Sequence, residues 1–293
     1  MKKVSFHISF FVLIAFILAS FFSAKKAGYQ LYSRSKKINL DAVVQSTDTN
    51  RVLIFGEEHN DSVAHYLQLR LLQDLFKVHG VNLVLSLEMF QQEDQYIMNE
   101  YLSGLIKEKF FLDDANAWSN YASDYRSLVE FAKDKKLKVI CSNAPFRYAN
   151  LVSVYGMDSL MNVSNYGKQF LPPLPFTEAS PVYRKKIEDL MGGMATNDST
   201  GYDLLKGQAL WNASMAYFIN QQIVLDSNSV VFHINGRLHS DGHLGLPEKL
   251  VQYNSALENR IGVITCRQFE NKPSKSEIKE LDSEGDFVVV TFN

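Results

Sequence analysis

The sequence predicts an α/β protein in which a mostly parallel central sheet is flanked by helices. Two observations lead to this prediction: short continuous apolar runs recur along the chain, and segments with apolar residues at helical spacing separate them. Strands buried on both faces read as continuous apolar runs, and parallel strands need crossover connections. The composition agrees, because 46% of the 293 residues are apolar and 21% are charged, as in folded globular proteins.

Six apolar runs are the expected strands. They are 52–55, 81–90, 137–143, 229–236, 260–266 and 286–293. Because the last run follows a polar stretch, we expect it as an antiparallel strand at the sheet edge. Helical spacing is clearest at 62–79, where Val63, Leu67 and Leu71 recur. Further helices are expected at 92–105, 124–135 and 202–225.

The chain is expected to hold a single α/β domain at 51–293, preceded by two short segments. At 1–24, Lys2 and Lys3 stand before an apolar run, the pattern of a secretory signal peptide or an uncleaved N-terminal anchor. Residues 25–50 form a polar lead-in. We therefore expect an exported protein that is periplasmic, or membrane-anchored and facing outside the cytoplasm.

The stretch from about 151 to 201 interrupts the strand and helix pattern. It contains LPPLPF at 171–176 and MGGM at 191–194, and proline and glycine break regular structure. We expect an insertion of irregular structure and short helices inside the domain, serving as a lid or a binding surface.

Composition and missing motifs exclude several classes of function. Lys and Arg number 30 against 32 Asp and Glu, a net charge of −2, which argues against a nucleic-acid partner. Two cysteines are too few for a disulfide scaffold or a four-thiolate zinc site. The sequence has no HExxH, GxSxG or P-loop motif, which argues against a serine hydrolase or a nucleotide enzyme.

Polar side chains stand at the ends of four expected strands. Glu57 and His59 follow the first, Glu88 ends the second, Asn143 ends the third, and His239 follows the fourth. The carboxyl ends of parallel strands form one ligand-binding edge of a sheet. Two carboxylates and two imidazoles suit a divalent transition metal, so Glu57, His59, Glu88 and His239 are the predicted metal ligands.

Neighbouring polar residues have plainer interpretations. Glu58 is expected at a helix start, where carboxylates are favourable. His65 and Gln68 lie within the following helix and are expected to be structural or solvent-facing.

Six short sequence motifs, some of which contain the residues above, occur in order along the chain. They are GEEH at 56–59, LEMFQQEDQ at 87–95, WSNYASDYRSLVEFAK at 118–133, SNAPFRYA at 142–149, GQALWNASMA at 207–216 and NGRLHSDGHLGLPEKL at 235–250. With these motifs the chain resembles the ChaN-like haem-binding proteins of the wider TIKI and erythromycin-esterase superfamily. Asn212 stands where that family usually has Asp.

The resemblance implies an exported protein that binds haem non-covalently, or iron, for uptake. Haem iron takes an axial Tyr, His, Met or Cys. Tyr155, Tyr166, Tyr183 and Tyr202 lie in or beside the insertion. Tyr183 is the preferred ligand because basic residues follow it, and Arg147 and Asn143 are further predicted cofactor-binding residues. A homodimer and membrane contact through an uncleaved N-terminus are compatible with this interpretation.

The alternative is a metal-dependent hydrolase that acts on an ester or amide. Glu57, His59, Glu88 and His239 would then be catalytic, holding the metal and activating water. Arg147 or Asn143 would stabilise the developing oxyanion.

Overall fold

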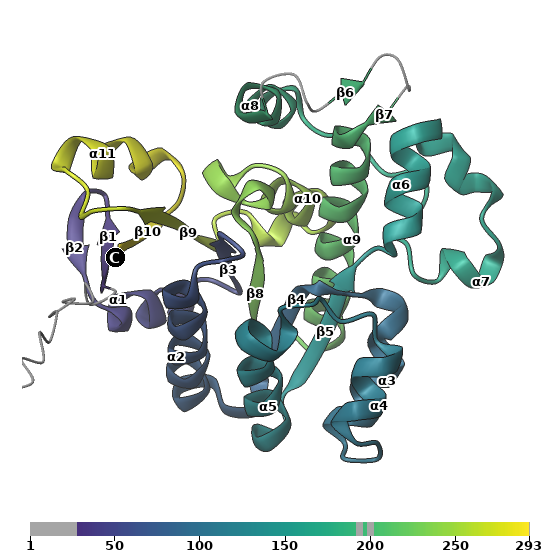
Figure 1. Ribbon diagram of the computed structural model, residues 1–293, viewed down its shortest axis with the longest axis horizontal. Helices are drawn as coiled ribbons and strands as arrows, with labels where there is room; N and C mark the ends of the chain where they lie inside the picture. The colour runs from purple at the N-terminus through teal and green to yellow at the C-terminus, as the bar shows by residue number, and fades with distance from the viewer. Residues whose placement is uncertain (1–27, 192–195, 198–201, 293) are drawn as a thin grey trace, which may run out of the picture.

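The computed structural model describes residues 28–191, 196–197 and 202–292. An eight-stranded sheet with the order β2-β1-β10-β9-β3-β8-β4-β5 crosses the molecule (Figure 1). Its strands are β1 (Gly28–Ser33), β2 (Lys36–Ile38), β3 (Val52–Glu57), β4 (Leu83–Gln91), β5 (Lys138–Asn143), β8 (Val230–Gly236), β9 (Ile261–Phe269) and β10 (Phe287–Phe292). The six strands from β10 to β5 are parallel, which confirms the predicted α/β class.

The antiparallel strands are not where the sequence predicted them. The expectation for the last run was wrong: β10 lies inside the sheet, parallel to β9 and antiparallel to β1. The polar stretch before β10 contains the short helix α11 (Lys275–Glu280), in which only Ile278 is buried. The lead-in segment instead supplies β1 and β2 at the sheet edge. β1 buries only Leu31 and Tyr32, so it lacks a continuous apolar run.

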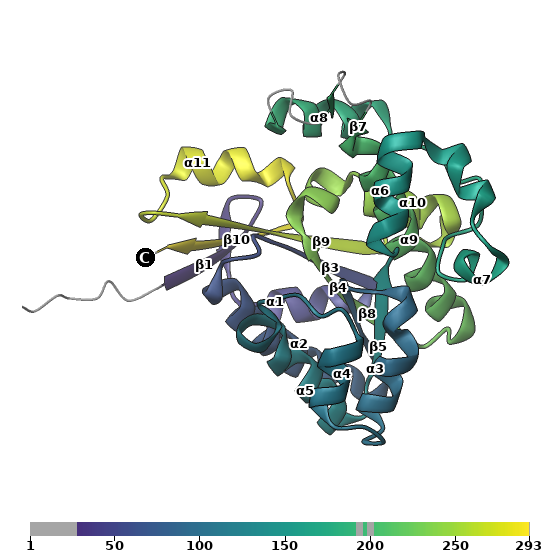
Figure 2. The ribbon, with the colours of Figure 1, turned by 45° about the vertical axis from the view of Figure 1, so that its right-hand side comes forward.

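Helices cover both faces of the sheet (Figures 1 and 2). The remaining helices are α1 (Leu40–Gln45), α2 (Ser62–His79), α3 (Gln95–Leu102), α4 (Glu108–Asp114), α5 (Arg126–Lys135), α6 (Phe146–Tyr155), α7 (Asn165–Lys168), α8 (Pro181–Met191), α9 (Leu204–Leu225) and α10 (Leu246–Tyr253). In β3, Leu53 and Phe55 join the core under α1 to α5, whereas Val52 and Ile54 join the core under α9 and α10. This two-sided burial explains the continuous apolar runs.

The helix α2 positions the first polar residues of the sheet edge. It spans the predicted residues 62–79, and the Asp61 carboxylate caps it by accepting hydrogen bonds from the N–H groups of Val63 (2.9 Å) and Ala64 (3.2 Å). A capping side chain at this position satisfies N–H groups that have no partner inside the helix. This cap fixes the end of the turn that leads from β3 into α2.

The region predicted as an insertion packs beside α9 and α10. Residues 169–180 form no helix or strand. Buried Lys249 on α10 holds this stretch, because its ammonium group donates to the carbonyl oxygens of Thr177 (2.7 Å) and Glu178 (2.8 Å). A separate pair of short strands, β6 (Thr196–Asn197) and β7 (Tyr202–Asp203), follows α8.

The predicted signal or anchor at 1–24 lies outside the described residues. Within the part of the chain that is described, no helix has the length and apolar character needed to cross a membrane.

Asp94 gives the fold a pH dependence that can be tested. It is buried before α3, and its carboxylate accepts from the Gln91 N–H (3.2 Å). Burial raises the pKa of Asp94 from 3.8 to about 7. The folded protein therefore keeps a proton that the unfolded chain releases, and stability falls as the pH rises from about 4 to about 7. At pH 8 the free energy of unfolding of the Asp94→Asn variant should be about 1–2 kcal/mol higher than that of the wild type.

Urea unfolding at pH 4, 6 and 8 measures this difference. The exposed residue Asp134, which pairs with Lys135, supplies the control variant Asp134→Asn. If the difference in unfolding free energy between wild type and Asp94→Asn stayed constant from pH 4 to pH 8, the raised pKa of Asp94 would be contradicted.

Candidate functional site

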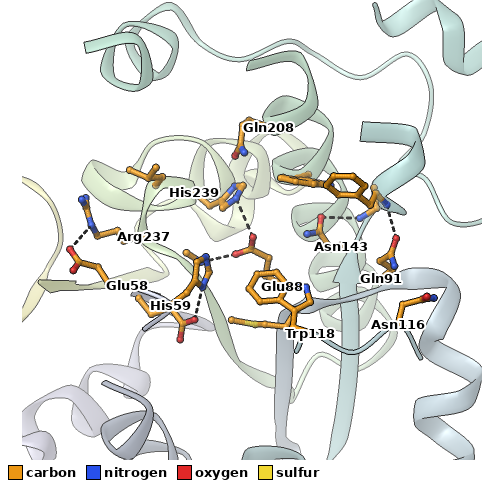
Figure 3. Close-up of a pocket in the computed structure, with 17 residues that line it drawn as sticks. Glu58, His59, Glu88, Gln91, Asn116, Trp118, Asn143, Gln208, Arg237 and His239 are labelled. Atoms are coloured by element: carbon orange, nitrogen blue, oxygen red, sulfur yellow. Dashed lines mark hydrogen bonds and ion pairs between the residues drawn. The ribbon is translucent and has the colours of Figure 1, made fainter. Parts of the chain in front are cut away.

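A pocket of about 650 Å³ opens where β3, β4, β5 and β8 end (Figure 3). The chain leaves β3 for β4 and later returns to place β8 between them, which is the kind of strand-order change at which α/β sheets bind ligands. The wall of the pocket combines charged side chains, amides and aromatic rings. The polar members are Glu57, Glu58, His59, Glu88, Arg237, His239, Gln91, Asn116, Asn143 and Gln208, and the aromatic members are Trp118, Phe146 and Trp211.

Glu57 is the buried centre of one half of the site. Its Oε1 accepts hydrogen bonds from the Tyr125 hydroxyl (2.5 Å) and from Nδ1 of His59 (2.8 Å), and its Oε2 accepts from the Gln68 amide. Burial and the Glu57 charge raise the pKa of Tyr125, so its hydroxyl remains a donor. Three donors satisfy a carboxylate that is only 1% exposed.

The contact with Glu57 determines which nitrogen of His59 is available. A carboxylate only accepts hydrogen bonds, so the neutral imidazole carries its proton on Nδ1 and presents the lone pair of Nε2. Burial lowers the pKa of His59, but the hydrogen bond to Glu57 and the charge of Glu88 outweigh burial and raise it. The side chain is 39% exposed, so ligands can reach it.

Gly236 lets the backbone of β8 approach Nε2 of His59 closely. A Cβ atom at this position would lie 2.7 Å from Nε2 of His59, closer than real Cβ contacts allow. The Gly236 N–H also donates to Oε2 of Glu88 (2.6 Å). Only glycine permits this approach of β8 to both side chains.

Glu88 and His239 form the other half of the site. Nε2 of His239 lies 3.3 Å from Oε1 of Glu88, and Nδ1 of His239 donates to the amide oxygen of Asn212 (2.7 Å). Burial acts to raise the pKa of Glu88, but His239, then His59 and the Gly236 N–H, outweigh it and lower the value to about 2. Glu88 is therefore a buried carboxylate that keeps its charge.

His65 and Gln68, expected to be structural, hold the Glu57 half of the site together. Nδ1 of His65 lies 3.1 Å from the Gln68 amide oxygen, and its Nε2 lies 3.1 Å from the carbonyl oxygen of His59. Both residues are buried on α2. This helix thus fixes the backbone at His59 and, through Gln68, the carboxylate of Glu57.

The structure brings together five of the seven site residues predicted from the sequence. Glu57, His59, Glu88, Asn143 and His239 all line the pocket.

Arg147 and Tyr183 are not among the residues that line it. The Arg147 guanidinium forms a two-bond pair with the Glu93 carboxylate (2.5 and 2.6 Å). Tyr183 on α8 is 1% exposed and packs with Ile187 and Leu205.

The sequence did not identify several residues of the pocket. Glu58 and Arg237 line it as an ion pair (3.2 Å), and Trp118 contacts His59 edge to face with ring centroids 5.1 Å apart. Trp118, which lines the pocket, and Tyr125, whose hydroxyl donates to Glu57, are seven residues apart in sequence and have ring centroids 6.2 Å apart. Their spacing in the motif at 118–133 was the signal that could have placed both of them here.

The four predicted metal ligands lie near one another without forming a recognisable metal centre. Across 28–191, 196–197 and 202–292, no group of three or more His, Cys, Asp or Glu side chains is arranged to hold a metal ion. The metal assignment stays a prediction.

The comparison with ChaN of Campylobacter jejuni supports the fold. ChaN of Campylobacter jejuni, solved as "Cofacial heme binding to ChaN", superimposes with a TM-score of 0.66 at 15% identity, covering 91% of this chain and 98% of that one. The type III effector HopBA1 gives 0.49 at 13% identity, covering 86% and 92%. The erythromycin esterase EreC gives 0.48 at 10% identity, covering 90% and 83%.

No curated protein matches the chain. The sequence profile described as "Haem-binding uptake, Tiki superfamily, ChaN" matches residues 43–250, which is most of the chain. This match confirms the resemblance seen in the motifs. The protein therefore belongs to the ChaN family of haem-binding uptake proteins in the Tiki superfamily.

Proposed function

We propose that this protein binds haem non-covalently in the pocket at the sheet edge and serves haem or iron uptake outside the cytoplasm. Membership of the ChaN family supports the ligand class. The observation that carries the proposal is His59, an accessible imidazole whose Nδ1 is held by Glu57 and whose Nε2 has no hydrogen-bond partner among the described residues (Figure 3).

The residues of the pocket fit haem. An imidazole nitrogen is a common axial ligand of haem iron, and a carboxylate hydrogen-bonded to the other ring nitrogen makes that ligand more basic. Trp118, Phe146 and Trp211 give apolar surface for a porphyrin ring. The volume of about 650 Å³ lies within the range of about 300–1,000 Å³ that is usual for cofactor pockets.

In this proposal His59 would hold the iron of haem, and the aromatic side chains of the pocket would cover the ring. Bound haem would supply an iron centre that accepts a nitrogen ligand. Buried Glu57 keeps the His59 imidazole oriented, and Gly236 lets the backbone of β8 lie close to Nε2 without a clash.

The proposal includes export. The basic and apolar pattern at 1–24 supports passage across a membrane, followed by cleavage or anchoring. Haem binds cofacially to ChaN of Campylobacter jejuni, and this mode of binding favours a homodimer here. Light scattering of the haem-loaded protein tests the dimer.

The metal-dependent hydrolase remains the alternative. Its predicted residues Glu57, His59, Glu88 and His239 do lie around one pocket. Assays with added Zn²⁺, Mn²⁺ or Fe²⁺ on ester and peptide panels test this alternative separately from haem binding.

A haemin titration of the purified protein, followed in the Soret region, tests haem binding directly. The proposal expects a saturable transition with a defined stoichiometry. A linear rise in absorbance that never saturates would show only non-specific adsorption and would refute the proposal.

His59→Ala should change the Soret spectrum and weaken haemin binding at least about tenfold, because it removes the proposed iron ligand. Added imidazole should restore the lost spectral signature. Tyr183→Phe should leave the spectrum unchanged, since the Tyr183 ring is buried outside the pocket lining.

His79→Ala is the matched control, because His79 pairs with Thr47 away from the pocket. If Tyr183→Phe removed the signature and His59→Ala did not, the ligand would be the tyrosine predicted from the sequence.

Gly236→Ala should lower haemin affinity without removing the ligand. The new Cβ would clash with His59, and the imidazole would have to move. We expect about a tenfold loss, comparable to losing a group that orients a metal ligand. Gly104→Ala is the control for a strained glycine substitution away from the pocket, because Gly104 has a φ of +80° and no atom lies within 4 Å of a Cβ there. Equal affinities for Gly236→Ala and wild type would show that His59 does not bind the iron.

A further inference from the structure

A second cleft, of about 770 Å³, lies between α8 and the end of the sheet, next to the pocket. We infer that this cleft is an anion subsite, in which Arg237 and Arg267 bind the carboxylate groups of the ligand held in the pocket. The inference rests on the proposed function, and it specifies a ligand with an apolar body and carboxylate arms, which is the chemistry of an iron porphyrin dicarboxylate.

Arg237 connects the two spaces. Its side chain belongs to the wall of both the pocket and the cleft. In Figure 3 it lies on the Glu58 side of the pocket, away from Glu88 and Asn143. Since Arg237 lines both spaces, a ligand bound in the pocket can contact its guanidinium.

The two guanidinium groups share one carboxylate. Oε1 of Glu58 lies 3.2 Å from Nε of Arg237 and 3.5 Å from Nε of Arg267. Asp241 accepts a further hydrogen bond from Nη1 of Arg237 (2.8 Å). For Arg267, no hydrogen bond within the described ranges engages the terminal Nη atoms. These two nitrogens form a planar fork that matches a carboxylate in two parallel hydrogen bonds.

Helix α8 adds ammonium groups and apolar side chains to the same cleft. Lys186 pairs with Glu284, and Lys185 pairs with Asp189 at 3.0 Å. Val182 and Leu190, 64% and 52% exposed, complete the wall. Apolar side chains beside cations favour an amphipathic carboxylate over a small inorganic anion, because burying their surface contributes to binding.

Binding of haemin and of its dimethyl ester to the purified protein tests the subsite. The ester keeps the iron and the ring but has no ionised carboxylates. We expect wild type to bind haemin about tenfold more tightly than the ester, the size of one charge-assisted hydrogen-bonded contact. Arg267→Gln should lose this preference while its affinity for the ester stays unchanged, and Arg267→Lys should keep part of it.

Two further variants separate local recognition from net charge. Arg70→Gln removes the same charge from α2, where Arg70 pairs with Asp74, and should keep the preference. Glu58→Gln removes the carboxylate that both guanidiniums share, and should increase the preference for haemin.

Each outcome has one meaning. If neither haemin nor the ester bound saturably, the proposed function itself would fail. If both bound with equal affinity, or if Arg267→Gln kept the full preference, haem binding would stand and the subsite would be refuted. If Arg70→Gln lost as much preference as Arg267→Gln, the effect would be long-range charge and the inference would also be refuted.

Discussion

The site depends on the buried carboxylate of Glu57 and the donors around it. A carboxylate in the interior is strongly unfavourable unless hydrogen bonds compensate for lost water. Tyr125, His59 and Gln68 supply three such bonds from different parts of the chain. The same contacts that stabilise the charge therefore fix the end of β3, the start of α2 and the orientation of the His59 imidazole.

The sheet topology explains how a pocket forms around this carboxylate. β8 lies between β3 and β4, so Gly236 reaches both His59 and Glu88. The charged cluster sits where the strands end, and aromatic side chains from outside the sheet complete the wall (Figure 3). The rigid strand ends thus hold the polar side chains in fixed orientations, and the surrounding helices and loops supply the apolar surface of the pocket.

Much of the fold could be predicted from the sequence, because doubly buried strands and amphipathic helices have clear periodicities. The helix at 62–79 and the strand-end residues Glu57, Glu88 and His239 follow from local pattern alone. β1 was missed because an edge strand buries few side chains. Trp118 was not assigned to the site, although its spacing from Tyr125 in the motif at 118–133 was an available signal. Arg237 directly follows β8, but its contact with Glu58 depends on how distant segments pack.

The central claim is that His59, oriented by Glu57, binds the iron of haem. Pulsed electron paramagnetic resonance of the ferric haem complex, prepared with ¹⁵N-histidine, tests it most directly. The account predicts a hyperfine coupling from an imidazole ¹⁵N that is present in the wild type and absent in His59→Ala. A high-spin spectrum without histidine coupling, or a coupling that survives in His59→Ala, would contradict it.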